Sequence, residues 1–154
     1  ELGLEFYFKS FQDLYHKDPI KNCSPYDGVM ELLELLQSQE VKLAICTQKF
    51  ENSAKKVLSQ LDLYKYFDGF AYGDSTEVLK PDPKVFYHAV NHFENGTYFY
   101  VGDTNVDLSL AKAVGATFFF HKKGYAPQTV DKVGIDFSFD SFGELTRHYE
   151  QNLA

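Results

Sequence analysis

The sequence predicts an α/β protein built on a doubly wound parallel sheet. Short apolar runs rich in β-branched and aromatic residues alternate along the chain with segments whose apolar residues recur at helical spacing. Such alternation is typical of parallel strands joined by crossover helices on both faces of the sheet. The chain has 154 residues, of which 44% are hydrophobic, and this is enough for one domain with a hydrophobic core.

Five short apolar segments are the expected strands of this sheet, at residues 41–46, 69–72, 98–101, 116–120 and 137–139. The expected helices lie at residues 29–36, 52–61, 85–93 and 104–114, with a last one from residue 142 onward. Gly115 directly follows the fourth of these helices and is expected to end it. No internal repeat or low-complexity tract interrupts the alternation.

The first 20 residues differ from the rest, because the helical pattern there has no strand attached to it. Large apolar side chains recur at helical spacing in this segment, namely Leu4, Tyr7, Phe8, Phe11, Leu14 and Tyr15. We therefore expect residues 1–20 to be the edge of a second element and residues 21–154 to form the α/β domain.

The composition restricts the partners that this chain is expected to have. A net charge of -7 argues against nucleic acid, since binding its phosphates needs clustered Lys and Arg. No run of 18 apolar residues is present, so no membrane span is expected. Cys23 and Cys46 lie far apart without metal-type spacing, and no signal peptide is visible. These features are typical of a cytoplasmic protein.

A pair of carboxylates follows the third expected strand. Gly102 ends the apolar run, Asp103 comes next, and Asp107 lies one turn into the following helix. Ligands of open α/β sheets bind beyond the carboxyl ends of the strands, so both carboxylates can face one crevice and hold Mg²⁺. On these residues alone, an equally good interpretation makes Asp103 the helix N-cap and Asp107 a first-turn charge favoured by the helix dipole.

Two more polar residues are expected at the same edge of the sheet. Thr47 follows the first strand, where its hydroxyl either binds a phosphoryl oxygen or simply ends the strand. Lys80 stands before Pro81 and is either a positioned cation or an ordinary exposed lysine, with little expected effect on stability. Together, a hydroxyl, a cation and two carboxylates at one sheet edge favour phosphoryl transfer.

In this order, the motifs resemble those of the haloacid dehalogenase superfamily of hydrolases, most closely its phosphoglycolate-phosphatase-like members with a Rossmann-like core. Ile-Cys-Thr-Gln-Lys at residues 45–49 resembles the second motif, which assigns phosphate binding to Thr47 and Gln48. Leu-Lys-Pro-Asp-Pro at 79–83 resembles the third, in which Lys80 binds phosphate and stabilises a phosphoaspartate. Val-Gly-Asp-Thr-Asn-Val-Asp at 101–107 resembles the fourth, which assigns Asp103 and Asp107 to the Mg²⁺ site.

The first motif of the family has no counterpart in this sequence. That motif is a strand ending in Asp-x-Asp, which supplies the nucleophile and the general acid/base, and no Asp-x-Asp occurs here. In the family this strand is central and lies between the strands that correspond to residues 41–46 and 98–101. The resemblance therefore implies that residues 1–20 are the tail end of a helical cap and that residues 21–154 are a core lacking its first strand.

Two interpretations of this departure differ in the class of protein they imply. The chain is either the C-terminal portion of a cap-bearing phosphatase or a degenerate, non-catalytic binding or assembly protein. Retention of Thr47, Lys80, Asp103 and Asp107 favours the phosphatase. The resemblance then implies Mg²⁺-dependent hydrolysis of a small phosphorylated metabolite through a phosphoaspartate. Alone, the 154 residues are expected to be inactive, and to self-associate or to pair with a missing N-terminal segment.

Overall fold

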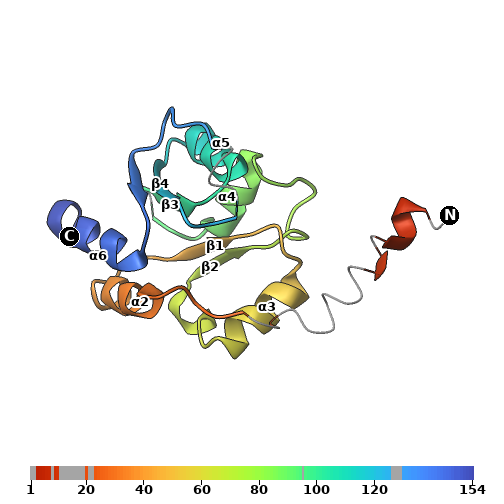
Figure 1. Cartoon of the computed structure of the whole chain (residues 1–154), viewed down its shortest axis with the longest axis horizontal. Helices are drawn as coiled ribbons and strands as arrows, with labels where there is room; N and C mark the ends of the chain where they lie inside the picture. Colours follow the sequence, from red (N-terminus) through yellow and green to blue (C-terminus); the bar gives the residue numbers. More distant parts are fainter. Residues whose placement is uncertain (1–2, 8, 11–19, 21–22, 95, 126–129) are drawn as a thin grey trace.

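The computed structural model describes residues 3–7, 9–10, 20, 23–94, 96–125 and 130–154 and has the expected α/β architecture (Figure 1). The strands are β1 (Ala44–Cys46), β2 (Gly69–Ala71), β3 (Phe99–Gly102), β4 (Thr117–His121) and β5 (Phe137–Phe139). The helices are α2 (Val29–Ser38), α3 (Glu51–Gln60), α4 (Pro83–Ala89), α5 (Asn105–Val114) and α6 (Phe142–Asn152), with a 3₁₀ helix, η1 (Tyr64–Tyr66), before β2.

The order of strands and helices therefore follows the prediction, while β1 is shorter than the apolar run at residues 41–46. The reason lies in Asp68, whose carboxylate accepts a hydrogen bond from the backbone N–H of Leu43 at 3.1 Å. The carbonyl of Leu43 accepts from the backbone N–H groups of Asp68 and Gly69, but its N–H is bonded to a side chain, and the ladder with β2 begins at Ala44, opposite Gly69.

Over the described residues the strands form two separate parallel sheets instead of one. In the first, β1 pairs with β2, and in the second the order is β3-β4-β5. Each sheet therefore has an edge, formed by β1 in one and by β3 in the other, that carries no strand partner among these residues.

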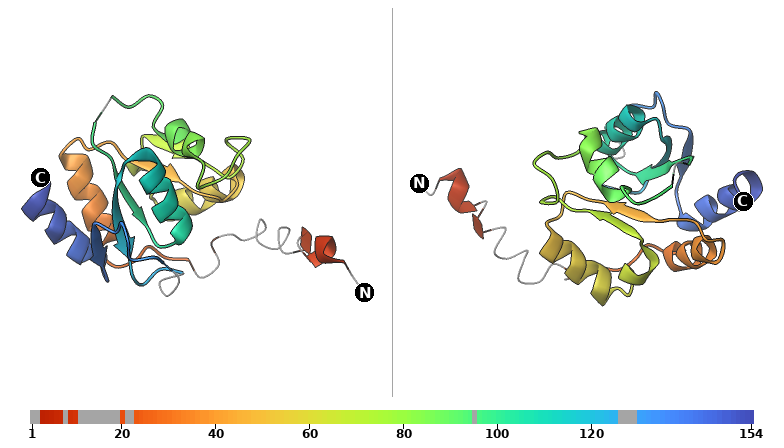
Figure 2. Two further views of the ribbon diagram at one scale, coloured as in Figure 1. Left: turned by 90° about the horizontal axis from the view of Figure 1, so that it is seen from above. Right: turned by 180° about the vertical axis from the view of Figure 1, so that it is seen from behind.

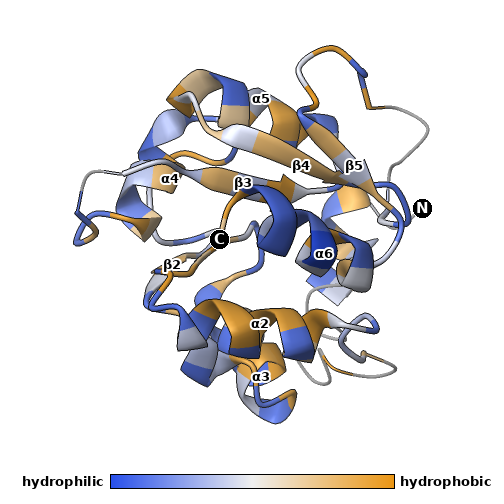
Figure 3. Ribbon diagram, turned by 90° about the vertical axis from the view of Figure 1, so that its left-hand side faces the viewer, coloured by the Kyte–Doolittle hydropathy of each residue, from blue (hydrophilic) through white to orange (hydrophobic). Residues whose placement is uncertain are grey.

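Helices cover both sheets. Helix α4 packs on β1 and β2, α5 packs on β3 and β4, and the two helices contact each other. Helices α2 and α6 lie side by side in both views of Figure 2, and α6 also packs on β5. Figure 3 shows that α2 and β4 carry many hydrophobic residues, whereas α6 is mostly hydrophilic along its outer side.

The side chains of β4 alternate between two hydrophobic clusters, as expected for a strand that is covered on both faces. Phe118 and Phe120 belong to the larger cluster, together with the buried residues of α4 and α5. Phe119 points the other way and packs with Leu32 of α2 and Leu145 of α6. The long aromatic run of this strand thus joins the helices on the two sides of the second sheet.

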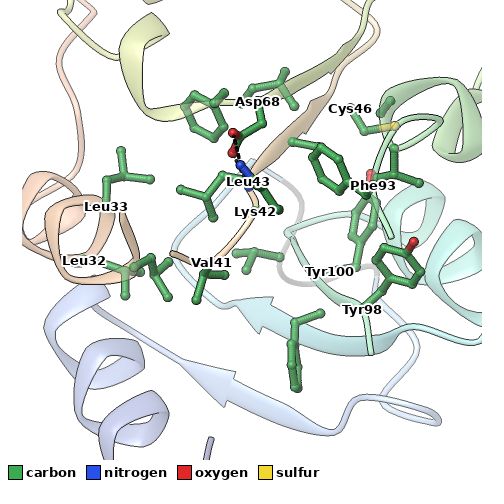
Figure 4. Close-up of a pocket in the computed structure, with 18 of the residues that line it drawn as sticks. Leu32, Leu33, Val41, Lys42, Leu43, Cys46, Asp68, Phe93, Tyr98 and Tyr100 are labelled. Carbon is green, nitrogen blue, oxygen red and sulfur yellow. Dashed lines mark hydrogen bonds and ion pairs between the residues drawn. The ribbon is translucent and has the colours of Figure 1, made fainter. Parts of the chain in front are cut away.

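A groove separates the edges of the two sheets. It has a volume of about 1400 Å³, and residues of β1, β3, α2, α4 and α6 line it. Figure 4 shows side chains of α2 and of residues 41–46 facing Tyr98 and Tyr100 across this space. Its volume exceeds the 300–1,000 Å³ of ordinary small-molecule pockets.

The N-terminal residues lie apart from the sheets in Figure 1. Residues 4–7 are helical as predicted, and Leu4 and Tyr7 are exposed. The remaining members of the predicted apolar stripe, Phe8, Phe11, Leu14 and Tyr15, lie outside the described residues. No helix in the described part of the chain has the length and apolar character needed to cross a bilayer.

Candidate active site

Thr47 and Gln48 directly follow β1, at the carboxyl end of the first sheet. The backbone N–H of Thr47 continues the ladder by donating to the carbonyl of Ala71 at 2.9 Å, and its hydroxyl oxygen accepts from the backbone N–H of Lys49 at 3.2 Å. The side-chain amide of Gln48 donates to the backbone carbonyl of Lys80 at 3.4 Å. The second and third motifs are therefore in contact.

Lys80 lies in the loop before α4, and its side chain turns inward. The ammonium Nζ is 2.6 Å from Oδ1 of Asp107, and the two side chains are only 12% and 8% exposed. The interpretation of Lys80 as an ordinary exposed lysine is therefore wrong. Because a buried charge is tolerated only with a partner, we expect Lys80 to influence stability more than a surface lysine would. Tertiary packing, which the local sequence does not reveal, buries this cation.

Asp107 uses both of its carboxylate oxygens within the chain. Oδ1 accepts from Lys80, and Oδ2 accepts from the hydroxyl of Thr104 at 2.6 Å and from the backbone N–H groups of Thr104 and Asp103 at 3.2 and 3.3 Å. Burial acts to raise the pKa of Asp107, but the charge of Lys80 and these hydrogen bonds outweigh it and hold the pKa below its usual value.

The start of α5 decides between the two interpretations of Asp103. The N-cap of α5 is Thr104, which forms a reciprocal capping box with Asp107, so the interpretation of Asp103 as the N-cap is wrong. Asp107 does serve the helix start as the alternative expected, in addition to pairing with Lys80. Gly102 permits this packing, since a Cβ there would lie 2.4 Å from the Cβ of Asp107.

Asp103 directly follows the end of β3, and its side chain takes no part in the capping box of α5. Its Oδ2 accepts a hydrogen bond from the backbone N–H of Tyr125 at 2.6 Å, and Oδ1 receives none from the described residues. Gly124 makes this contact possible, because a Cβ there would lie 2.2 Å from Oδ2 of Asp103. A partly satisfied carboxylate beyond a strand end is a suitable ligand for Mg²⁺, which is usually bound by one or two carboxylates together with waters and substrate.

The described residues contain no group of three or more His, Cys, Asp or Glu side chains that could hold a metal ion. Asp103 is thus the carboxylate that fits a Mg²⁺ site with a sparse protein ligand set, while Asp107 is already engaged by Lys80 and Thr104.

Aromatic side chains pack together at the end of β4, close to Asp103. The ring of Tyr26 packs edge-on against His121 at 4.8 Å and stacks on Phe142 at 5.9 Å. Burial raises the pKa of Tyr26, and the nearby Tyr125 and Asp103 raise it further. The segment that leads into α2 therefore reaches the carboxyl end of the second sheet.

The structure brings Gln48, Lys80, Asp103 and Asp107 together at the edge where the carboxyl ends of β1 and β3 lie. The side chain of Gln48 is hydrogen-bonded to the loop that carries Lys80, and Lys80 forms an ion pair with Asp107. The carboxylate of Asp107 in turn accepts a hydrogen bond from the backbone N–H of Asp103. Thr47 lies at the end of β1, but in the described structure no hydrogen bond or ion pair joins its side chain to Lys80, Asp103 or Asp107. This edge presents a cation, a carboxylate and a hydroxyl, which is a combination suited to holding a phosphoryl group and a divalent cation.

Three contributors were missed by the sequence analysis. Tyr100 hydrogen-bonds both members of the ion pair, Thr104 caps α5, and the backbone of Tyr125 holds Asp103. Thr104 was open to detection, because a Thr followed three residues later by an acidic residue is a capping-box signal. Tyr100 and Tyr125 act through long-range contacts for which no local pattern exists.

Comparison with known proteins assigns this chain to a family. The model of the family described as haloacid dehalogenase-like hydrolase matches residues 2–120, so the chain belongs to that family. Among curated relatives, phosphoglycolate phosphatases of Cereibacter sphaeroides and Rhodospirillum rubrum are 30% and 31% identical over 141 and 133 residues, which are 90% and 85% of this chain. The chain spans 65% and 55% of the length of these two relatives.

Solved structures agree with this assignment. A predicted phosphoglycolate phosphatase from Haemophilus somnus 129pt superposes with a TM-score of 0.83 at 27% identity, covering 96% of this chain and 68% of its own. CbbY from Rhodobacter sphaeroides in complex with phosphate superposes with a TM-score of 0.79 at 19% identity, over 94% of this chain and 66% of its own, which supports the fold alone.

Proposed function

We propose that this chain is the larger part of a cytoplasmic, Mg²⁺-dependent phosphatase of the phosphoglycolate-phosphatase type. The observation that carries the proposal is the buried pair of Lys80 and Asp107, which holds an ammonium group at the edge where Thr47, Gln48 and Asp103 also lie. The similarity to phosphoglycolate phosphatases supports a small phosphorylated metabolite as substrate.

In this proposal each residue acts on the phosphoryl group or on the cation. The ammonium of Lys80 and the hydroxyl of Thr47 bind phosphoryl oxygens, and Gln48 holds the two loops together. Asp103 ligates Mg²⁺, and Asp107 supports the site by orienting Lys80 and the start of α5. Mg²⁺ supplies electrophilic stabilisation of the phosphoryl charge when it is bound.

We propose further that the nucleophile enters on a parallel strand that lies in the groove between β1 and β3. Both of these strands have an unpaired edge among the described residues, and residues of both line the groove. Their carboxyl ends converge on Lys80, through Gln48 on one side and Asp107 on the other. A strand placed between them ends at the same point and delivers its terminal carboxylate to the phosphoryl group.

The proposed chemistry is a two-step phosphoryl transfer. An oxygen of the strand carboxylate forms a bond to phosphorus while the bond from phosphorus to the substrate oxygen breaks, and that oxygen takes a proton from a second acidic residue on the same strand. Water, which gives a proton back to that second acidic residue, then attacks the phosphorus of the acyl phosphate; the bond between phosphorus and the carboxylate oxygen breaks, which releases inorganic phosphate and restores the carboxylate.

The test combines the 154-residue chain with a synthetic peptide that carries five apolar residues followed by Asp-x-Asp. The chain alone should not hydrolyse p-nitrophenyl phosphate at an enzymatic rate, and addition of the peptide with Mg²⁺ should produce turnover. A peptide ending in Asn-x-Asn is the matched control and should bind without restoring activity. Turnover should also disappear in Asp103→Asn.

Two outcomes would contradict the proposal. Robust turnover by the chain alone that Asp103→Asn abolishes would place the nucleophile on another residue of this chain. Peptide binding without any turnover, in wild-type chain and at saturating Mg²⁺, would favour a degenerate protein that keeps the fold for binding or assembly.

A further inference from the structure

A single buried hydroxyl contacts groups from separate segments of the site. Tyr100 lies on β3 with a side chain that is 7% exposed. Its hydroxyl accepts from Nζ of Lys80 at 3.4 Å and donates to Oδ1 of Asp107 at 3.4 Å. The hydroxyl is therefore hydrogen-bonded to both charged groups of the buried ion pair.

The side chain of Tyr100 also lies near the first sheet. Cys46, the last residue of β1, packs against the hydrophobic cluster that contains Tyr100, and Figure 4 shows Cys46 and Tyr100 at the same end of the groove. Burial raises the pKa of Tyr100, with Cys46 and Asp107 adding to the effect, so the hydroxyl stays neutral and keeps its proton for donation. Tyr100 thus links the ends of β1 and β3.

The contacts of Lys80 occupy two of the three N–H donors of its ammonium group. An ammonium group has three N–H donors. One is directed at Asp107 and a second at Tyr100, whose ring centroid lies 5.9 Å from Nζ. With two donors directed by the protein, the direction of the third is determined.

We propose that Tyr100 is a positioning residue, which orients the remaining N–H of Lys80 toward the phosphoryl group. This inference rests on the proposed function. Tyr100 is itself too deeply buried to touch the substrate and acts only through Lys80 and Asp107.

The variant Tyr100→Phe removes one oxygen and keeps the ring contacts with Phe86 and Phe118. The control is Tyr98→Phe, since Tyr98 also packs on Phe86 and no hydrogen bond joins it to Lys80 in the described structure. Unfolding midpoints of both variants verify that they are folded.

The first measurement is the rate of acetylation of Lys80 in the 154-residue chain, read by mass spectrometry relative to Lys42. Lys42 is a suitable reference because its side chain is 65% exposed. Tyr100→Phe should raise the ratio at least about threefold, since the ammonium loses a hydrogen bond that restrains it. Tyr98→Phe should leave the ratio unchanged. An unchanged ratio in Tyr100→Phe would overturn the proposal.

The second measurement is the affinity for inorganic phosphate with Mg²⁺, by calorimetry, for wild type, Tyr100→Phe, Lys80→Met and the double variant. Tyr100→Phe should weaken binding about fivefold, and the double variant should bind like Lys80→Met alone, because Tyr100 acts through Lys80. Additive effects would overturn the proposal. Phosphate binding that Lys80→Met leaves intact would instead contradict the proposed function, and the acetylation ratio distinguishes the two failures.

Discussion

At the scale of single residues, the buried pair of Lys80 and Asp107 dominates the site. Its side chains are 12% and 8% exposed, and removing two charges from water costs several kcal/mol. Hydrogen bonds from Thr104 and Tyr100 complete the pair and help to offset this cost. Either partner alone would be an uncompensated buried charge, so the pair couples the stability of the fold to the geometry of the site.

We predict that Lys80→Met lowers the free energy of unfolding by about 3 kcal/mol, because it leaves the carboxylate of Asp107 buried without a partner. The matched control is Lys84→Met, which breaks an exposed pair with Glu77 and should cost less than about 1 kcal/mol. Urea unfolding at neutral pH measures both. Equal small losses would show that the ion pair is not buried as the structure has it.

The same pair has a defined pH dependence. The pKa of Asp107 is below its usual value in the folded chain, so its stabilisation is complete above the unfolded-state pKa of about 4 and is lost as pH falls through the folded pKa. The difference in unfolding free energy between wild type and Asp107→Asn should therefore be constant from about pH 7 to pH 5 and shrink below about pH 4. A difference that grows on acidification would contradict this prediction.

At the scale of elements, the first turn of α5 both caps the helix and carries the carboxylate that pairs with Lys80. Thr104 caps the helix, and the reciprocal member of the capping box is the residue that holds Lys80. The helix end therefore both satisfies its own N–H groups and fixes a site carboxylate. Gly102 before the turn and Gly124 opposite it leave the space that these carboxylates occupy.

We predict that Thr104→Ala destabilises the chain by about 1 kcal/mol and also weakens binding of inorganic phosphate, since Asp107 loses a hydrogen bond of 2.6 Å. Ser141→Ala removes the corresponding cap of α6, a hydroxyl that is bonded to Glu144 and not to Lys80, Asp103 or Asp107, and should cost a similar free energy without changing phosphate affinity. Calorimetry and thermal unfolding separate the two effects. Equal phosphate affinities in the two variants would contradict the coupling between cap and site.

At the scale of the whole molecule, the division into two sheets is the dominant feature. Phe99 and Val101 of β3 are 43% and 45% exposed, and both line the groove. Unpaired strand edges with apolar side chains are templates for pairing with another chain. Because the unpaired edges and exposed apolar side chains lie in the groove, we expect the groove to bind either an added strand or a second copy of the chain.

We predict that the 154-residue chain self-associates with increasing concentration and that the Asp-x-Asp peptide suppresses this association, because both compete for the same edges. Val101→Lys should weaken peptide binding and self-association, since it places a charge in the groove. Val133→Lys is the control, because Val133 is 71% exposed and lies outside the groove. Sedimentation velocity measures the association, and identical behaviour of the two variants would refute the assignment of the interface.

The sequence by itself determined the order of strands and helices, the end of α5 at Gly115, and the positions of Thr47 and Asp103 directly after strands. These properties depend on periodicity and turn chemistry over a few neighbouring residues. Only the tertiary structure decided that Lys80 is buried against Asp107, that Tyr100 joins them, and that the two sheets stand apart. The physical reason is distance along the chain: Lys80 and Asp107 are 27 residues apart, and only the packing of α4, α5 and β3 brings their charges together.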